Sequence, residues 1–163
     1  MLLRPTLAPI CLLLALPALA DTYTARVVGV TDGDTIKALD GTRVQHRIRL
    51  AGIDAPEKAQ PYGQRSKQHL AEQVIGREVT LSCGKHDRYK REVCVVLLEG
   101  QDINLSQVQA GYAWWYRQYA REQTPVQRKE YEEAERTAQE RQAGLWRDIS
   151  PIPPWEWRKH RLK

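Results

Sequence analysis

The chain has 163 residues and a formal charge of +5, a length that suits one domain with a modest basic excess. After the first twenty residues, no apolar run reaches the roughly 20 residues that a membrane-spanning helix needs. The basic residues are unevenly placed and are most concentrated at 158–163. A basic surface favours polyanions, but from charge alone we prefer the alternative that the charged face only aids solubility.

Residues 1–20 have the three parts of a secretory signal peptide. Arg4 and the amino terminus supply positive charge, residues 7–19 are apolar, and 18–20 form a small-x-small cleavage site. An uncleaved membrane anchor is the alternative, but the apolar stretch is short for that role. We therefore expect an exported protein, periplasmic or secreted, that begins at Asp21 and has no membrane contact after cleavage.

The first half of the mature chain is rich in strand signals, which we place at 23–30, 35–39, 43–50, 78–82 and 92–98. Asp40 and Gly41 indicate a tight turn between the second and third strands. Alternation in the third strand places Arg49 on its polar face, where a substrate contact needs it. His46 falls on the apolar face, where we interpret it as semi-buried rather than catalytic.

The second half is rich in helix signals. Residues 64–75 carry apolar side chains at helical spacing. Asn104 is predicted to cap a second helix that stops at Gly111, and Thr124 to open a third that runs to about Ala143. Strands with intervening helices predict an α+β fold, a five-stranded OB-type β-barrel with about three packed helices.

Two cysteines remain after signal cleavage, Cys83 and Cys94, on either side of residues 87–91. Export favours oxidation, so the two are a candidate disulfide across a hairpin, with two buried free thiols as the alternative. The sequence has no CxxC or Cys/His spacing that would indicate zinc.

Three short segments carry the chemistry. Residues 32–35 are Asp-Gly-Asp-Thr, residues 49–57 are Arg-Leu-Ala-Gly-Ile-Asp-Ala-Pro-Glu, and residues 87–91 are Asp-Arg-Tyr-Lys-Arg. Each segment taken alone could be an ordinary turn or loop. Together they supply acids that hold a hard cation and position water, and guanidinium groups that grip a phosphate. The joint pattern therefore predicts metal-assisted cleavage of a phosphodiester.

This motif set, in this order, resembles the thermonuclease family, the staphylococcal nuclease-like proteins, over about residues 23–146. The resemblance implies an OB-type barrel, one calcium ion (Ca2+), and hydrolysis of DNA and RNA that leaves 3′-phosphate ends. It also implies roles for particular residues: Asp34, Asp54 and the backbone carbonyl of Ala55 as calcium ligands, Arg49, Glu57 and Arg91 as catalytic residues, Arg88 and Tyr89 at the nucleotide phosphate, and Asp32 as an outer-shell acid.

The implied roles agree with the chemistry of the side chains. Calcium prefers hard oxygen ligands and tolerates bound water. Glu57 suits the orienting of an attacking water better than its full deprotonation, because a carboxylate is a weak base. Arg49 and Arg91 can donate paired hydrogen bonds to the phosphate, which lysine cannot do because it lacks the planar fork. The residue pattern itself does not fix which oxygen leaves.

Some positions depart from the family pattern. Lys90 stands where a glycine is common, and a positive φ there would strain a lysine. The aromatic segment 111–119 matches the family's paired-tyrosine region imperfectly. Within it, Tyr116 and Tyr119 are candidate platforms for stacking a base, whereas we interpret Trp114 and Trp115 as packing residues.

We therefore predict an exported, calcium-dependent, sugar-nonspecific nuclease that acts as a monomer and favours single-stranded DNA and RNA. Its nuclease domain is expected at 21–150, followed by a basic tail with prolines and tryptophans at 151–163 that docks on it. A noncatalytic nucleic-acid-binding module and an exported structural domain that uses calcium only for stability are the alternatives. Retention of the complete acid and arginine set favours the enzyme.

Overall fold

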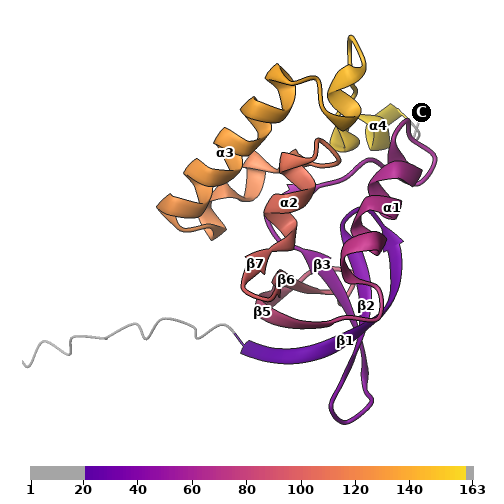
Figure 1. The fold of residues 1–163 in the computed structure, drawn as a ribbon, viewed down its shortest axis with the longest axis vertical. Helices are drawn as coiled ribbons and strands as arrows, with labels where there is room; N and C mark the ends of the chain where they lie inside the picture. Colours follow the sequence, from indigo (N-terminus) through magenta and orange to yellow (C-terminus); the bar gives the residue numbers. More distant parts are fainter. Residues whose placement is uncertain (1–20, 161–163) are drawn as a thin grey trace, which may run out of the picture.

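The computed structural model describes residues 21–160, so the predicted signal peptide and the last three residues lie outside the described part. One six-stranded sheet has the order β3-β2-β1-β5-β6-β7, and a parallel pairing of β3 with β6 closes its first five strands into a barrel (Figure 1). The strands are β1 (Asp21–Asp32), β2 (Thr35–Asp40), β3 (Gln45–Leu50), β5 (Glu78–His86), β6 (Glu92–Leu98) and β7 (Gln101–Asp102). The predicted five-stranded OB-type barrel is confirmed.

The helices gather at one end of the barrel, with α1 beside β1, and α3 and α4 farthest from the six-stranded sheet (Figure 1). They are α1 (Gly63–Val74), α2 (Ile103–Gln109), α3 (Pro125–Glu140), α4 (Pro154–His160) and the 3-10 turns η1 (Arg117–Glu122) and η2 (Gly144–Arg147). A short second sheet pairs β4 (Ile53–Asp54) with β8 (Trp114–Trp115). Within residues 21–160, every helix is too short or too polar to cross a membrane.

The barrel interior is apolar and fully buried. Val27, Ile36, Ile48, Leu81 and Val96 fill it, each from a different strand. Their period-2 spacing in β1, β2, β3, β5 and β6 points alternate side chains inward. The intervening residues are left to face outward, and Arg49 is one of them. The two tryptophans of β8 are also buried, as predicted.

Several predicted element ends differ from the structure: β5 continues to His86 rather than ending at 82, and α3 ends at Glu140 rather than at about Ala143. Two further local predictions are wrong for identifiable reasons. The third strand begins at Gln45 rather than at 43, because Arg43 has a positive φ of 66° in a turn that the Asp40 carboxylate stabilises. Asn104 does not cap α2, since Asp102 accepts the capping hydrogen bond from a backbone N–H. Asn104 is instead buried inside the helix, and its amide donates to the carbonyl oxygens of Ala51 and Cys94.

His46 is semi-buried, as expected, and is held between two acids. Its ring nitrogens lie 2.6 Å from a Glu92 oxygen and 3.0 Å from an Asp40 oxygen. The second Glu92 oxygen accepts a hydrogen bond of 2.6 Å from the Tyr23 hydroxyl. This cluster ties β1 and β3 to the start of β6.

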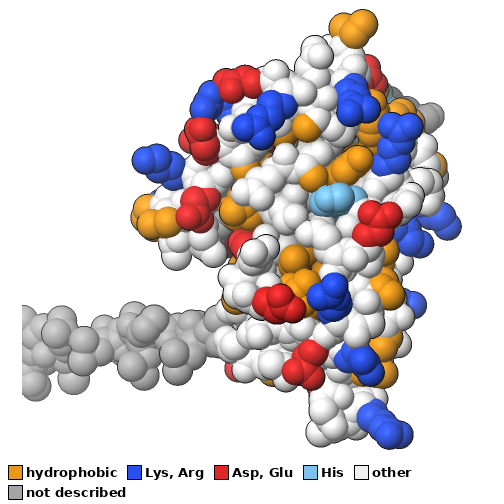
Figure 2. Space-filling model, viewed as in Figure 1, with side chains coloured by type: hydrophobic (Ala, Val, Ile, Leu, Met, Phe, Trp, Pro, Cys, Tyr) orange, Lys and Arg blue, Asp and Glu red, His pale blue; other side chains and the backbone are white. Residues whose placement is uncertain are grey.

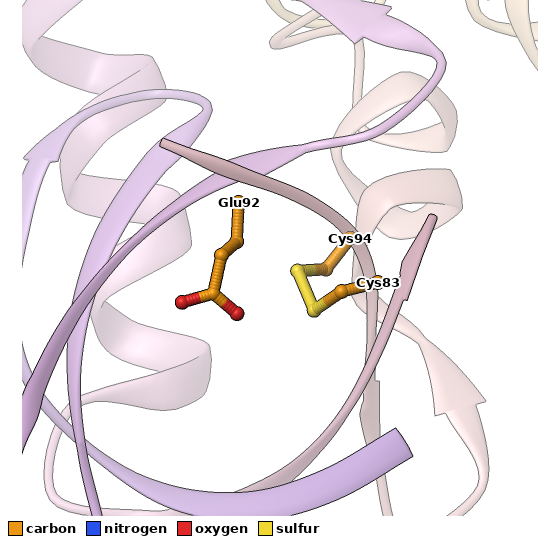
Figure 3. A group of neighbouring side chains, drawn as sticks. All are labelled: Cys83, Glu92 and Cys94. Atoms are coloured by element: carbon orange, nitrogen blue, oxygen red, sulfur yellow. A yellow bond between two sulfur atoms is a disulfide. The ribbon is translucent and has the colours of Figure 1, made fainter. Parts of the chain in front are cut away.

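Cys83 and Cys94 face each other across β5 and β6 and form a disulfide. The carboxylate of Glu92 lies close to both sulfurs (Figure 3). These three side chains would be near enough to share a metal ion, but the disulfide leaves no thiolate to act as a ligand. The free-thiol alternative is therefore not the arrangement of this structure.

Candidate active site

A cleft of about 770 Å³ lies where the three motif segments meet. Residues from 32–34, 49–57 and 85–93 line it, together with residues from 116–122 and Arg158 of α4. On the face shown in Figure 2, basic and acidic side chains are interspersed, and no patch of one sign covers it.

Asp34 lies buried in the tight connection between β1 and β2. Gly33 lets this connection press against α1, because a Cβ at that position would lie 1.8 Å from the Ser66 hydroxyl oxygen. One Asp34 oxygen accepts a hydrogen bond of 2.8 Å from the backbone N–H of Ala55. The other accepts one of 3.1 Å from the Thr35 hydroxyl. The carboxylate is thereby fixed beside the 54–57 segment.

Asp54 and Asp34 meet at a single guanidinium group. Nη2 of Arg49 donates to Asp54 Oδ1 at 2.9 Å, and Nη1 lies 3.2 Å from Asp34 Oδ2. Asp54, on β4, is only 2% exposed. The polar face of β3 thus carries Arg49 to these acids, as its alternation predicted. Arg49 is therefore in direct contact with both carboxylates and lies on the same side of the cleft as they do.

Arg91 is held at the start of β6 by two side chains. Its Nε donates to Asp87 Oδ2 at 2.8 Å, while Asp87 Oδ1 accepts from two backbone N–H groups of the 87–91 turn. Its Nη1 donates to the hydroxyl of Thr35 at 3.1 Å. Because that hydroxyl also contacts Asp34, the predicted phosphate-binding arginine is linked to a predicted metal ligand.

Asp32, Asp34 and Asp54 lie close together and are shielded from water, which disfavours negative charge on all three at once. Burial, reinforced by the charge of Asp34, raises the pKa of Asp32 to about 7 and that of Asp54 to about 6. A bound cation would relieve this crowding. The donors are hard oxygens, two carboxylates with the adjoining backbone of Ala55, and such a set fits a hard divalent cation such as Ca2+.

Glu57 lies in the loop after β4, and its side chain is 35% exposed at the cleft. Its carboxylate accepts a hydrogen bond of 2.8 Å from Nη1 of Arg158. The Arg158 guanidinium also donates to Asp54 Oδ2 at 2.8 Å. This partly exposed carboxylate next to two arginines can contact water in the cleft.

Arg88 and Tyr89 project from the tip of the 87–91 turn. Tyr89 is 57% exposed, and the guanidinium of Arg88 lies over its ring at 4.8 Å. Lys90 has a φ of 60°, so it adopts the left-handed conformation that glycine accepts more easily. Both Arg88 and Tyr89 line the cleft, with side chains accessible to a ligand.

Tyr116 and Tyr119 also line the cleft, but their rings are differently placed. Tyr116 is stacked on Trp155 of α4, with ring centroids 5.4 Å apart and an interplanar angle of 6°. That ring face is therefore occupied. Tyr119 is exposed, and the Lys85 ammonium lies 4.7 Å from its ring centroid. Of the two predicted stacking platforms, Tyr119 is the more accessible.

Three residues of the site had no role in the sequence-based prediction. Thr35 and Asp87 each lie in one of the three motif segments, but the sequence assigned neither of them a role in the site. Arg158 lies in the predicted basic tail. A run of basic residues does not reveal from sequence which of them face solvent and which form ion pairs. A local signal was present for Thr35 and Asp87 in the motif spacing, whereas none was present for Arg158.

Comparisons with known proteins identify nuclease relatives over most of the chain. The family model described as staphylococcal nuclease homologue matches residues 47–148. A Haemophilus influenzae protein named uncharacterized endonuclease is 43% identical over 136 residues, which cover 83% of this chain and 73% of that protein. An Escherichia coli O157:H7 protein of the same name is 42% identical over 144 residues, covering 87% and 89%. A Shigella flexneri protein named micrococcal nuclease is 39% identical over 166 residues, covering 96% and 92%.

Proposed function

The chain belongs to the family of staphylococcal nuclease homologues and is a nuclease, and on that premise we propose that it is an exported, calcium-dependent endonuclease that hydrolyses both DNA and RNA. The observation that carries the proposal is the contact of Asp34 and Asp54 with one guanidinium group, Arg49, in a cleft that Glu57 and Arg91 also line.

In this proposal Asp34, Asp54 and the backbone carbonyl of Ala55 hold one calcium ion. When bound, the ion supplies a Lewis acid that offsets negative charge on the phosphate. The proposal is supported by the burial of both carboxylates and by the raised pKa of Asp54, which burial and the charge of Asp34 cause even though Arg49 and Arg158 contact this acid. Asp32 contacts the backbone N–H of Asp34 and acts from the outer shell.

The proposed catalytic residues are Arg49, Glu57 and Arg91. Glu57 accepts a proton or a hydrogen bond from the attacking water, and its partial exposure gives water access to the carboxylate. Arg49 and Arg91 donate hydrogen bonds to the phosphate oxygens as negative charge develops on them. Arg91 is anchored through two of its nitrogens, which leaves its remaining N–H groups for substrate.

Substrate binding is proposed to rest on phosphate contact and stacking. Arg88 and Tyr89 contact a phosphate, and Tyr119 offers the accessible ring for a base. Such contacts form no hydrogen bonds with base edges, so the enzyme selects neither a base sequence nor a sugar. Unpaired strands bind most easily because their bases are free to stack. We further propose that it acts as a monomer and leaves 3′-phosphate ends.

The deciding experiment incubates the purified protein without residues 1–20 with plasmid, single-stranded DNA and RNA, in calcium or in chelator. We expect cleavage of all three substrates in calcium and none in chelator, with labelled products that end in 3′-phosphate. Fractionation of cells that produce the full chain tests export. Binding of all three substrates without cleavage in any divalent metal would instead support the noncatalytic module.

Glu57→Gln tests the assignment of the active site. It should lower turnover by about a hundredfold or more while the affinity for an oligonucleotide changes little. Glu72→Gln, at an exposed position of α1, is the matched control and should cleave as the wild type does. Equal losses in turnover and affinity for Glu57→Gln would indicate a binding role for that carboxylate.

A further inference from the structure

We propose that Arg158 of α4 is a positioning residue that holds the Glu57 carboxylate in the cleft, so that the C-terminal helix completes the active site. The inference rests on the proposed nuclease function and adds a residue to it. It begins from a contact over 101 positions of sequence, the 2.8 Å hydrogen bond between Arg158 Nη1 and Glu57 Oε1. Arg158 is the member of α4 that lines the cleft.

Glu57 needs such a partner because of where it lies. Asp34 and Asp54 are buried, and each contacts Arg49. Glu57 instead lies in the loop after β4, and a glutamate has three side-chain torsions that a partly exposed loop position does not fix. Within residues 21–160, Arg158 supplies the one hydrogen bond that the Glu57 carboxylate receives. Removing Arg158 would therefore leave the carboxylate oxygens without a fixed direction.

Arg158 is itself held in place by a second contact. Its Nη2 donates to Asp54 Oδ2 at 2.8 Å, so the guanidinium bridges two carboxylates with two different nitrogens. A planar fork of this kind fixes the relative placement of both partners, which a point charge does not. With 41% of its side chain exposed, Arg158 also has donors that remain accessible from the cleft.

The helix that carries Arg158 is docked by aromatic packing. Trp155 stacks on Tyr116 and contacts the edge of Trp114, with ring centroids 5.4 and 6.4 Å apart. Such ring pairs favour a defined orientation as well as burial. They set α4 against β8 and against Tyr116, which follows β8 and lines the cleft.

Buried Gln60 connects the α4 segment to the Glu57 loop directly. Its amide nitrogen donates to the Ile152 carbonyl at 2.6 Å, and its amide oxygen accepts from the Glu57 backbone N–H at 3.1 Å. The backbone of Glu57 and the approach to α4 are therefore fixed to the same side chain. Two independent links, one through the backbone and one through Arg158, join Glu57 to this part of the chain.

The test compares Arg158→Ala with the wild type at saturating calcium. Under this condition a change in calcium affinity, caused by the lost contact with Asp54, does not alter the measured rate. We expect kcat to fall about tenfold or more, as is typical for outer-shell partners, with KM changed less than about twofold. Oligonucleotide affinity in chelator, where no cleavage occurs, should also stay within about twofold. Lys159→Ala removes a neighbouring charge from an exposed position of the same helix and should leave all three quantities unchanged.

Arg158→Lys and Trp155→Ala keep the test independent of folding. The lysine keeps the charge but not the fork, so it should recover only part of the lost kcat at a wild-type melting temperature. Trp155→Ala frees the helix and should lower kcat in the same way, with the double variant losing no more than Arg158→Ala alone.

An Arg158→Ala protein as active as the wild type, or more active, would overturn the positioning role, and higher activity would identify the arginine as a brake. A loss confined to KM would overturn it as well, by assigning Arg158 to substrate binding. A wild-type protein that cleaves nothing would instead defeat the nuclease proposal itself, and Glu57→Gln in the same assay separates that outcome from a failure at Arg158.

Discussion

The guanidinium of Arg91 donates a hydrogen bond of 3.1 Å to the hydroxyl of Thr35, which lies 56 positions earlier in the chain and is 1% exposed. The hydroxyl in turn donates to Asp34 at 3.1 Å. One buried oxygen therefore joins the carboxylate proposed for calcium to the arginine proposed for phosphate. The distance between these two groups is set by the barrel and not by flexible side chains.

Arg91→Lys should reduce kcat about a hundredfold even though the charge is kept. Arg91 uses Nε for Asp87 and Nη1 for Thr35, and the single ammonium of lysine cannot reach both partners and still present a fork to phosphate. Steady-state cleavage of a single-stranded oligonucleotide measures the effect. Arg77→Lys, at an exposed position outside the cleft, is the control. Near-normal turnover of Arg91→Lys would count against its role in the transition state.

Gly33→Ala should weaken calcium binding about tenfold or more and also lower the melting temperature. The added Cβ would lie 1.8 Å from the Ser66 oxygen and 2.8 Å from the Ala55 Cβ, so the connection that carries Asp34 has to move. Calorimetric titration with calcium measures the affinity. Gly41→Ala is the matched control, because its Cβ would meet no atom within 4 Å. Equal affinities for the two variants would show that this close approach does not position the ligands.

The stability of the protein should depend on pH through His46. Burial disfavours the charged imidazole, but the hydrogen bonds to Asp40 and Glu92 outweigh it and raise the pKa of His46. The stabilisation is therefore complete below the unfolded-state pKa of about 6.5 and is lost as the pH rises through the higher folded-state pKa. Melting temperatures between about pH 6 and pH 9 should fall by a few degrees in the wild type.

In His46→Gln the same interval should give a flatter profile, because the ionisable partner of the two acids is gone. His86→Gln, at an exposed position, should keep the wild-type profile. If the slopes of wild type and His46→Gln coincide, the pH dependence has another origin.

Loss of the disulfide should lower the free energy of unfolding by about 2–3 kcal/mol, because the bond closes a short loop of 11 positions in the unfolded chain. The double variant Cys83→Ala/Cys94→Ala tests this by denaturant titration. Reductant should destabilise the wild type by a similar amount and leave the double variant unaffected. A wild type that is equally stable with and without reductant would contradict the prediction.

The sequence was sufficient to predict the barrel, and its three motif segments indicated residues that the structure brings to one cleft. Alternation in β3 separates Ile48, which is buried in the barrel, from Arg49, which reaches the acids. This assignment needs only the two-residue period of a strand. The motif order then predicted that residues 34, 54, 57 and 91 meet, and all four line one cleft.

The errors come from choices that a local pattern cannot make. Asp102 and Asn104 are both good capping residues two positions apart, and burial of Asn104 between two carbonyl oxygens decides between them. Arg158 contacts Asp54 over 104 positions, a separation at which neither charge nor periodicity identifies a partner. The stacking of Tyr116 on Trp155 has the same origin, since docking of the last helix determines it.

Three residue pairs of β3 and β6 close the barrel, and one of them places Arg49 opposite Val93, two positions after Arg91. The pairing that closes the sheet into a barrel thus also brings β3, which carries Arg49, beside the start of β6, which Arg91 immediately precedes. Mild heat or denaturant that breaks the three β3–β6 pairs would move Arg49 and Arg91, the proposed phosphate ligands, apart while most other strand pairs persist. We therefore expect nuclease activity to be lost at a lower temperature or denaturant concentration than the circular-dichroism signal of the sheet. Activity would then report whether β3 and β6 remain paired.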